Sequence, residues 1–247
     1  MKVANIMPIP LLKKYGHMTT YHMVLSHLAQ NNSEYAAFYQ KRAEQGDYII
    51  TDTSVIELKN PLTLKEQIPI ATKIGASELI CANYPLDKEK TLASTSNELA
   101  MVARNCPFKI MAVVQGRTFK DLVQCYIELC KFPQIDTIGF STTMSIWMKP
   151  SVDRFFFTTY LMNNGLLDRS KEYHLLGTTN DPTEILRQSK YKWIRGVDSR
   201  LAVIQGLQNK TLNEPRELRK FDFYSDKDTP LVLENIKTLI KWAKGDE

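Results

Sequence analysis

The chain has 247 residues, of which 43% are hydrophobic, and it carries a formal net charge of +5. This composition is ordinary for a soluble globular protein with a sizeable core. No apolar run approaches the roughly 20 residues that cross a bilayer, and residues 1–16 lack the pattern of a signal peptide. We therefore expect a soluble cytoplasmic protein without a membrane partner. The mild basicity is compatible with a polyanionic partner but does not require one.

The cysteines and histidines indicate no metal site. No two cysteines form a Cys-x-x-Cys pair, and no histidine stands at zinc spacing from them. The cysteines, expected as free thiols, are Cys81, Cys106, Cys125 and Cys130. Three early histidines are spaced by five residues, which does not place them on one helix face; they are His17, His22 and His27. We expect neither a metal nor another cofactor.

A strand followed by a helix recurs along the chain. Residues 2–9 are expected as the first strand, and residues 19–44 as one or two helices, because their apolar positions follow helical spacing. Further strands are expected at residues 47–51, 78–82, 108–114, 137–140, 173–177 and 192–197, with 221–224 as a short eighth. Further helices are expected at residues 63–74, 87–105, 118–131, 152–165, 182–188, 199–208 and 231–244.

This alternation predicts a parallel sheet with helices outside. Seven or eight such units favour an α/β fold, a single (β/α)8 TIM-like barrel domain over residues 1–247 without a zinc module. An open doubly wound sheet is the alternative. After Gln208 the chain contains Asn213, Pro215 and many charges, so the barrel is expected to be irregular there.

Polar residues follow the predicted strands, at the end where barrel enzymes place their chemistry. Asp52 and Asp198 each come directly after an apolar run, where a carboxylate is costly unless it is used or paired. A pairing with Arg200 or a lysine would explain Asp198 structurally. Gln115 presents both a donor and an acceptor. Other residues expected at this edge are Asn83, Tyr84, Asp87, Gly139, Ser141, Gly177 and Thr178.

Several of these residues also have structural explanations. Asp87 fits a helix N-cap, and Ser141 and Thr178 fit ordinary loop positions. His27 reaches the barrel mouth only if its segment caps the barrel, and His174 is expected as a hydrogen-bonded core residue. The chain contains no P-loop, GxGxxG, HExxH or GxSxG motif.

Two carboxylates across a barrel mouth can act as nucleophile and acid/base at a glycosidic carbon. Five short motifs follow one another on successive strands: IITDTSVIE, AVVQGRT, TIGFS, LLGTTNDPTEIL and RGVDSR. Their order resembles the queuine and archaeosine tRNA-ribosyltransferase superfamily. It is most similar to the short, phage-type DNA relatives, which exchange guanine for a 7-deazaguanine. The resemblance spans residues 47–207.

The resemblance implies a role for each matching residue. Asp198 would be the nucleophile and Asp52 the acid/base. The base-binding residues would be Gln115, Gly116, Gly139, Asn83 and Gly177, and further candidates are Asp87, His27, Tyr84 and Arg200. Tyr84 or Phe140 would stack on the base. Basic residues that would hold phosphates, unless they only form a solvated surface, are Lys149, Arg154, Arg195 and Arg200.

The departures from the family pattern affect substrate choice. Thr53 and Ser54 replace a Gly-containing turn, and Asn83 stands where the family often places a base-reading aspartate. The family's zinc-binding Cys/His module is missing, since no cysteine follows Cys130. The resemblance therefore implies DNA as the polymer, with tRNA less favoured, and guanine or a 7-deazaguanine as the base. The protein would act in the host cytoplasm if a phage encodes it.

Two other classes remain open. One is a barrel lyase, aldolase or isomerase acting on a small phosphorylated metabolite. Such an enzyme predicts a glycine-rich phosphate site after the last strands, for which only Gly196 and Gly206 are available. The other is a nucleic-acid-binding barrel without catalytic activity, which Thr53, Ser54 and Asn83 would favour.

Overall fold

The computed structural model describes residues 1–102, 106–146, 153–178, 181–214 and 221–246. Eight strands alternate with helices along the chain. The strands are β1 Lys2–Asn5, β2 Tyr21–Leu25, β3 Tyr48–Asp52, β4 Glu78–Ile80, β5 Lys109–Val114, β6 Thr137–Ser141, β7 Glu172–Leu176 and β8 Ile194–Ser199. The longer helices are α3 Ser33–Glu44, α5 Leu64–Ile74, α6 Lys88–Met101, α7 Phe119–Cys130, α9 Arg154–Asn163 and α12 Pro230–Lys244. The shorter ones are α1 Leu12–Tyr15, α2 Ser26–Asn31, α4 Val55–Leu58, α8 Thr143–Ile146, α10 Glu184–Ser189 and α11 Leu201–Leu207.

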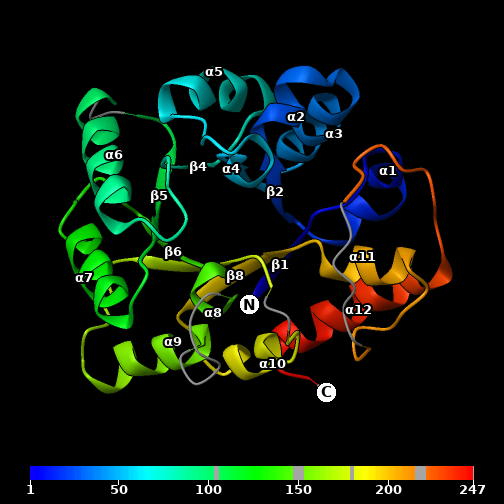
Figure 1. Cartoon of the computed structure of the whole chain (residues 1–247). Coiled ribbons are helices and arrows are strands. Elements are labelled where there is room, and N and C mark those ends of the chain that lie inside the picture. The colour runs from blue at the N-terminus through cyan, green and yellow to red at the C-terminus, as the bar shows by residue number, and fades with distance from the viewer. Residues whose placement is uncertain (103–105, 147–152, 179–180, 215–220, 247) are drawn as a thin grey trace.

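The strands form one parallel sheet in the order β1-β8-β7-β6-β5-β4-β3-β2. The two ends of this order, β1 and β2, lie beside each other, so the sheet curls into a nearly closed barrel. In Figure 1 the helices surround the strands, with α5 at the top, α6 and α7 on the left, and α9 and α10 at the bottom. The predicted (β/α)8 barrel is confirmed, and the open doubly wound sheet is wrong.

The strands separate two apolar layers because successive side chains point to opposite faces. A large outer core lies between strands and helices. A smaller inner cluster fills the barrel and consists of Ala4, Tyr21, Met23, Ile50, Ile80, Met111 and Val113. Local signals in the sequence set the helix ends. For example, Thr63 and Glu66 form a capping box at the start of α5, and Gly75 ends it with φ +67°.

Two predictions about the strands are wrong. Residues 21–25 form β2 rather than a helix, because all five side chains are buried and a fully buried strand shows no alternation. Residues 221–224 form a loop instead of an eighth strand, since β2 already completes the barrel. The predicted bounds at residues 105 and 152, together with Lys149 and Pro215, lie outside the described residues.

The barrel is irregular where its first and last units meet. The connection from β1 to β2 contains only α1 and two 3-10 turns, η1 Ile9–Leu11 and η2 Gly16–Met18. The C-terminal helix α12 packs against α10, α11 and β1. Gly206 on α11 allows this close packing, because a Cβ added there would lie 2.5 Å from Cα of Val232. The barrel was predicted to be irregular only near the C-terminus. It also departs from the regular strand–helix pattern between β1 and β2, where the connection contains only short helical turns.

We expect Gly206→Ala to lower the free energy of unfolding by about 1–3 kcal/mol, because the added methyl group pushes α12 off the barrel. Equilibrium urea unfolding measures the change. Lys237→Ala, on the exposed face of α12, is the control and should change stability by less than about 0.5 kcal/mol. A Gly206→Ala protein as stable as the parent would show that α11 and α12 do not pack this closely.

Candidate active site

A cavity of about 450 Å³ lies at the carboxyl ends of the strands and contains both predicted catalytic aspartates. Asp52 ends β3, and Asp198 lies near the end of β8. Met23, Val113 and Leu176 contribute apolar surface. Polar groups come from several neighbouring strands and loops: Asn83, Gln115, Ser141, Thr142, Thr143 and Thr178. The cavity thus combines apolar walls with a few convergent polar groups, as ligand sites do.

Asp198 is held by two donors on one oxygen. His174 Nε2 lies 3.1 Å from its Oδ1, and the backbone N–H of Gly177 donates to the same oxygen at 3.1 Å. Within the described residues, no hydrogen bond involves Oδ2 of Asp198. The carboxylate lines the cavity and is only 7% exposed. One oxygen is therefore anchored, and the other is free to contact a ligand. The expected pairing of Asp198 with Arg200 or a lysine is replaced by His174.

Gly177 needs the backbone freedom of glycine. Its φ is +69°, and a Cβ there would lie 2.9 Å from Cγ2 of Thr142. The side chain of Arg154 fixes this turn by donating to the carbonyls of Phe140, Leu176 and Gly177, at 2.9, 3.0 and 3.0 Å. The predicted base-binding Gly177 thus lines the cavity and also orients the predicted nucleophile.

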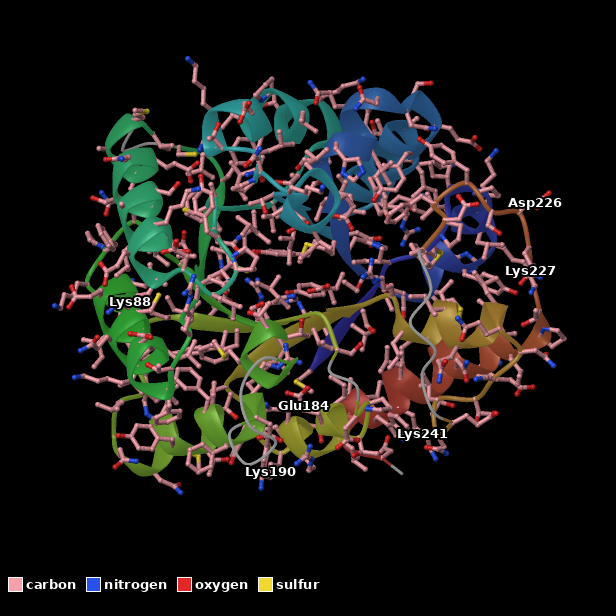
Figure 2. The ribbon with its side chains drawn as sticks, viewed as in Figure 1. Lys88, Glu184, Lys190, Asp226, Lys227 and Lys241 are labelled. Carbon is pink, nitrogen blue, oxygen red and sulfur yellow. The ribbon has the colours of Figure 1, made fainter. Side chains whose placement is uncertain are left out.

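Arg154 is completely buried and does not hold phosphates as predicted. It forms a two-pronged ion pair with Glu184, at 2.7 and 2.9 Å, and Glu184 lies on α10 (Figure 2). Arg195 is a second wrong prediction of this kind, because it lies inside the barrel against Glu78 and Glu172. Arg200 does line the cavity, where its guanidinium lies 3.8 Å from the carboxylate of Glu57.

Asp52 is partly buried, and its Oδ2 accepts the N–H of Ser54 at 3.0 Å. Burial, followed by the neighbouring carboxylates of Glu57 and Asp198, raises the pKa of Asp52 to about 7. Ser54 makes this turn with φ +55°. A side chain with this pKa can both release and accept a proton near neutral pH.

Gln115 and Asn83 form an amide pair at the cavity wall. Gln115 Nε2 donates to Asn83 Oδ1 at 3.0 Å, and Gln115 Oε1 accepts from the N–H of Leu86 and the hydroxyl of Thr143, both at 3.2 Å. Because an N–H can only donate, the Leu86 contact fixes the orientation of the Gln115 amide. Both predicted base-binding amides therefore line the cavity in a defined orientation.

The other predicted residues do not line the cavity. Gly116 packs against α7, where a Cβ would lie 2.7 Å from Cβ of Asp121, and Gly139 packs inside the barrel against Leu176. Asp87 is the N-cap of α6, as its structural explanation predicted. The ring of Tyr84 lies under Nζ of Lys90.

Phe140 is also absent from the cavity, because it is buried in the outer core. His27 lies close to the cavity without lining it. Its backbone N–H donates to Ser54 Oγ at 3.3 Å, and its ring contacts Phe223, which does line the cavity.

Sequence reasoning missed two residues at the site. His174 was expected as a core residue, and it is fully buried, but it also contacts Asp198. The alternation of β7 could have revealed it, because His174 lies two residues from the cavity-lining Leu176 and faces the same interior. Glu57 lies on the one-turn helix α4, which no sequence pattern indicated.

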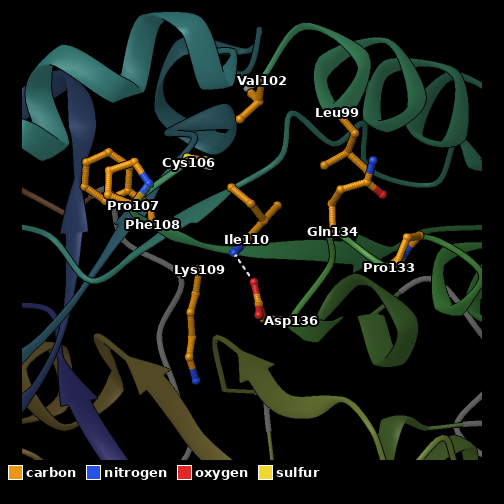
Figure 3. A pocket seen from close by; sticks show the side chains of 10 residues that line it. All are labelled: Leu99, Val102, Cys106, Pro107, Phe108, Lys109, Ile110, Pro133, Gln134 and Asp136. Carbon is orange, nitrogen blue, oxygen red and sulfur yellow. Dashed lines mark hydrogen bonds between the residues drawn. The ribbon is translucent and has the colours of Figure 1, made fainter. Parts of the chain in front are cut away.

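A second cavity, of about 350 Å³, lies at the opposite end of the barrel, where β5 begins (Figure 3). Its walls combine apolar side chains, such as Leu99, Val102 and Ile110, with the polar side chains of Lys109, Gln134 and Asp136. The carboxylate of Asp136 accepts a hydrogen bond from the N–H of Ile110 at 2.9 Å. Lys109 forms an ion pair with Glu172 at 2.9 Å. This cavity contains none of the predicted site residues.

The described ranges contain no cluster of three His, Cys, Asp or Glu side chains that could hold a metal ion. All four cysteines are free thiols. None of the helices in the described part of the chain is long and apolar enough to cross a membrane.

Comparisons with known proteins support the fold alone. Neither the family models nor the curated proteins give a match to this sequence. The chain is similar in structure to N-acetylneuraminate lyase from Mycoplasma synoviae, with a TM-score of 0.50 and 8% identity, over 81% of this chain and 68% of that one. It is also similar to a metallated homocysteine methyltransferase from Escherichia coli, with a TM-score of 0.45 and 11% identity, over 76% and 77%.

Asp52→Asn should make the protein more stable at pH 8, by on the order of 2 kcal/mol. The folded state raises the pKa of Asp52 to about 7, so the parent loses stability as the pH rises from about 4 to 7. Asparagine has no charge to bury, so the variant lacks this loss. Urea unfolding at pH 5 and pH 8 measures it. The control is Asp226→Asn, a surface carboxylate labelled in Figure 2. An unchanged pH dependence in Asp52→Asn would contradict the raised pKa.

Proposed function

We propose that the protein is a glycosyltransferase that exchanges guanine in DNA for a 7-deazaguanine base through a covalent bond between Asp198 and the sugar. The main observation in support is the pair of unlike carboxylates in one cavity. Asp198 has one anchored and one free oxygen, whereas Asp52 has a pKa of about 7. Such a division is what a double displacement at an anomeric carbon requires.

The reaction follows from these two environments. Oδ2 of Asp198 attacks C1′ of the deoxyribose, and the bond from C1′ to N9 of guanine breaks with its electron pair on the base. Protonated Asp52 supplies the proton that the leaving guanine takes up. The ionised Asp52 then removes the N9 proton of the incoming 7-deazaguanine, whose nitrogen attacks C1′. Asp198 leaves as a carboxylate, and Asp52 is protonated again.

The remaining walls of the cavity suit a purine-like base. A flat ring would contact Met23, Val113 and Leu176, and its polar edge would meet the amides of Asn83 and Gln115. A cavity of about 450 Å³ is within the usual size range for a small-molecule site. In duplex DNA the target base must first leave the stack, because its glycosidic bond is inaccessible inside the helix.

The metabolite-enzyme alternative has less support. Gly196 and Gly206, the glycines that could form a phosphate loop, instead pack against Tyr21 and Val232. The cavity walls, as far as the structure describes them, include no lysine that could form a Schiff base with a carbonyl substrate. Two carboxylates without such a lysine favour glycosidic chemistry.

We expect the purified protein to incorporate labelled guanine into guanine-containing DNA, and Asp198→Ala to lower the rate by at least about 1,000-fold, because no nucleophile remains. Scintillation counting of precipitated DNA measures the exchange, and tRNA serves as a parallel substrate.

Asp226→Asn, which changes an exposed carboxylate, should exchange at the parental rate. Asp198-dependent label in tRNA alone would keep the mechanism and overturn DNA as the substrate. The proposal fails if the parent protein labels neither polymer. If the parent and Asp198→Ala are then both folded and bind DNA equally well, the result favours the nucleic-acid-binding barrel without catalytic activity.

A further inference from the structure

A line of polar side chains runs from the mostly buried Arg195 across the barrel interior and ends at Asp198. Arg195 Nε donates to the hydroxyl of Tyr21 at 3.1 Å. That hydroxyl lies 2.8 Å from Nδ1 of His174, and Nε2 of His174 lies 3.1 Å from Oδ1 of Asp198. The residues come from β8, β2, β7 and β8 again. Tyr21 and His174 are 1% and 0% exposed, so water cannot replace these partners.

The direction of each hydrogen bond follows from the chemistry of the guanidinium group. An arginine can only donate, so the oxygen of Tyr21 is the acceptor of the Arg195 bond. The single hydrogen of Tyr21 is then available for Nδ1 of His174, which must accept it. Nδ1 therefore carries no hydrogen, and the ring hydrogen of a neutral imidazole is on Nε2, directed at Asp198. In the reverse arrangement, the buried hydroxyl hydrogen of Tyr21 would have no acceptor among the described residues.

Carboxylates at the amino ends of the strands, opposite the cavity with the two aspartates, hold Arg195 in place. Its guanidinium pairs with Glu78 at 2.5 Å and Glu172 at 2.6 Å, and Nη1 also donates to the hydroxyl of Tyr48 at 3.1 Å. The titratable groups that act on His174 are thus Asp198 and Glu78, which favour its cation, and Arg195, which opposes it. Burial outweighs the carboxylates and lowers the pKa of His174, which keeps the imidazole neutral.

We infer that His174 is a positioning residue, whose neutral Nε2–H form, set by Arg195 and Tyr21, holds Oδ1 of Asp198 and leaves Oδ2 free to react. A neutral donor orients the carboxylate without cancelling its charge, whereas an imidazolium would form a full ion pair and weaken the nucleophile. The consequence for catalysis rests on the proposed function, but the protonation state and direction of hydrogen bonding do not.

The first test is NMR of ¹⁵N-histidine-labelled protein between about pH 6 and pH 8. His174→Gln assigns the His174 signals by difference, since the chain has only four histidines. We expect one protonated nitrogen, Nε2, and an unprotonated Nδ1 over the whole range. Protonation at Nδ1, alone or together with Nε2, would overturn the inference whether or not the protein exchanges bases.

The second test compares His174→Gln with His174→Leu in the exchange assay. The glutamine amide keeps an N–H near the position of Nε2, and leucine removes it. We expect kcat to fall about 100-fold in His174→Leu and less than about 10-fold in His174→Gln, with KM for DNA unchanged within about 2-fold. Equal kcat values in the two variants would assign His174 a packing role only and overturn its positioning role. If the parent protein itself shows no base exchange, the proposed function is rejected. The NMR result would still decide the direction of the hydrogen bonds.

Discussion

The guanidinium of Arg195, whose side chain is only 11% exposed inside the barrel, is the constraint on which the site depends. A cation inside a barrel is costly unless it is paired and fully hydrogen-bonded. Glu78 and Glu172 supply the charges, while the hydroxyls of Tyr21 and Tyr48 accept two more bonds. These interactions at the amino ends of the strands hold the hydroxyl of Tyr21 in the barrel interior. The geometry at the open end is therefore set by charges that no ligand in the cavity would touch.

Arg154 supports the same site from outside the barrel. It ties the carbonyls at the ends of β6 and β7 to Glu184 on α10, so that the Gly177 N–H points at Asp198. The two donors to Asp198 thus depend on two different arginines, the fully buried Arg154 and the mostly buried Arg195. Neither Arg154 nor Arg195 is therefore available to bind phosphates. Arg200 does line the cavity, but its charge lies beside the carboxylate of Glu57. A basic net charge does not by itself locate a nucleic-acid surface on this protein.

The sequence predicted the barrel and the edge of the sheet where polar residues gather, because strand–helix alternation and strand ends are local patterns. Asp52, Gln115, Asn83, Gly177 and Asp198 were placed in this way, and all five line the cavity. The errors arose where the decisive contact is distant in sequence or the local pattern is ambiguous. The buried strand β2 has the apolar spacing of a helix. The alternation of β7 places His174 inside the barrel, but it does not predict the contact with Asp198, which joins neighbouring strands at a register irregularity.

Glycines show the same limit in another form. Gly116 and Gly177 both follow a strand end, and both were expected to contact a base. Only Gly177 lines the cavity, with a left-handed backbone and a donor aimed at Asp198, whereas Gly116 makes room for α7. The sequence reports that a side chain is missing at each position, but the reason depends on which neighbour the backbone approaches.

The two aspartates also show how identical side chains acquire different chemistry. Asp198 has two hydrogen-bond partners on one oxygen, the His174 ring and the backbone N–H of Gly177. Burial and then the nearby carboxylates of Glu57 and Asp198 raise the pKa of Asp52 to about 7, although a backbone N–H contact partly offsets them. Ionised Asp198 therefore helps to keep Asp52 protonated. If Asp198 becomes esterified to a sugar, its charge is lost and the pKa of Asp52 must fall. In the proposed cycle, the pKa of Asp52 falls at the step in which Asp52 has given up its proton. When Asp198 leaves the sugar and regains its charge, the pKa of Asp52 rises again and favours uptake of a proton by Asp52.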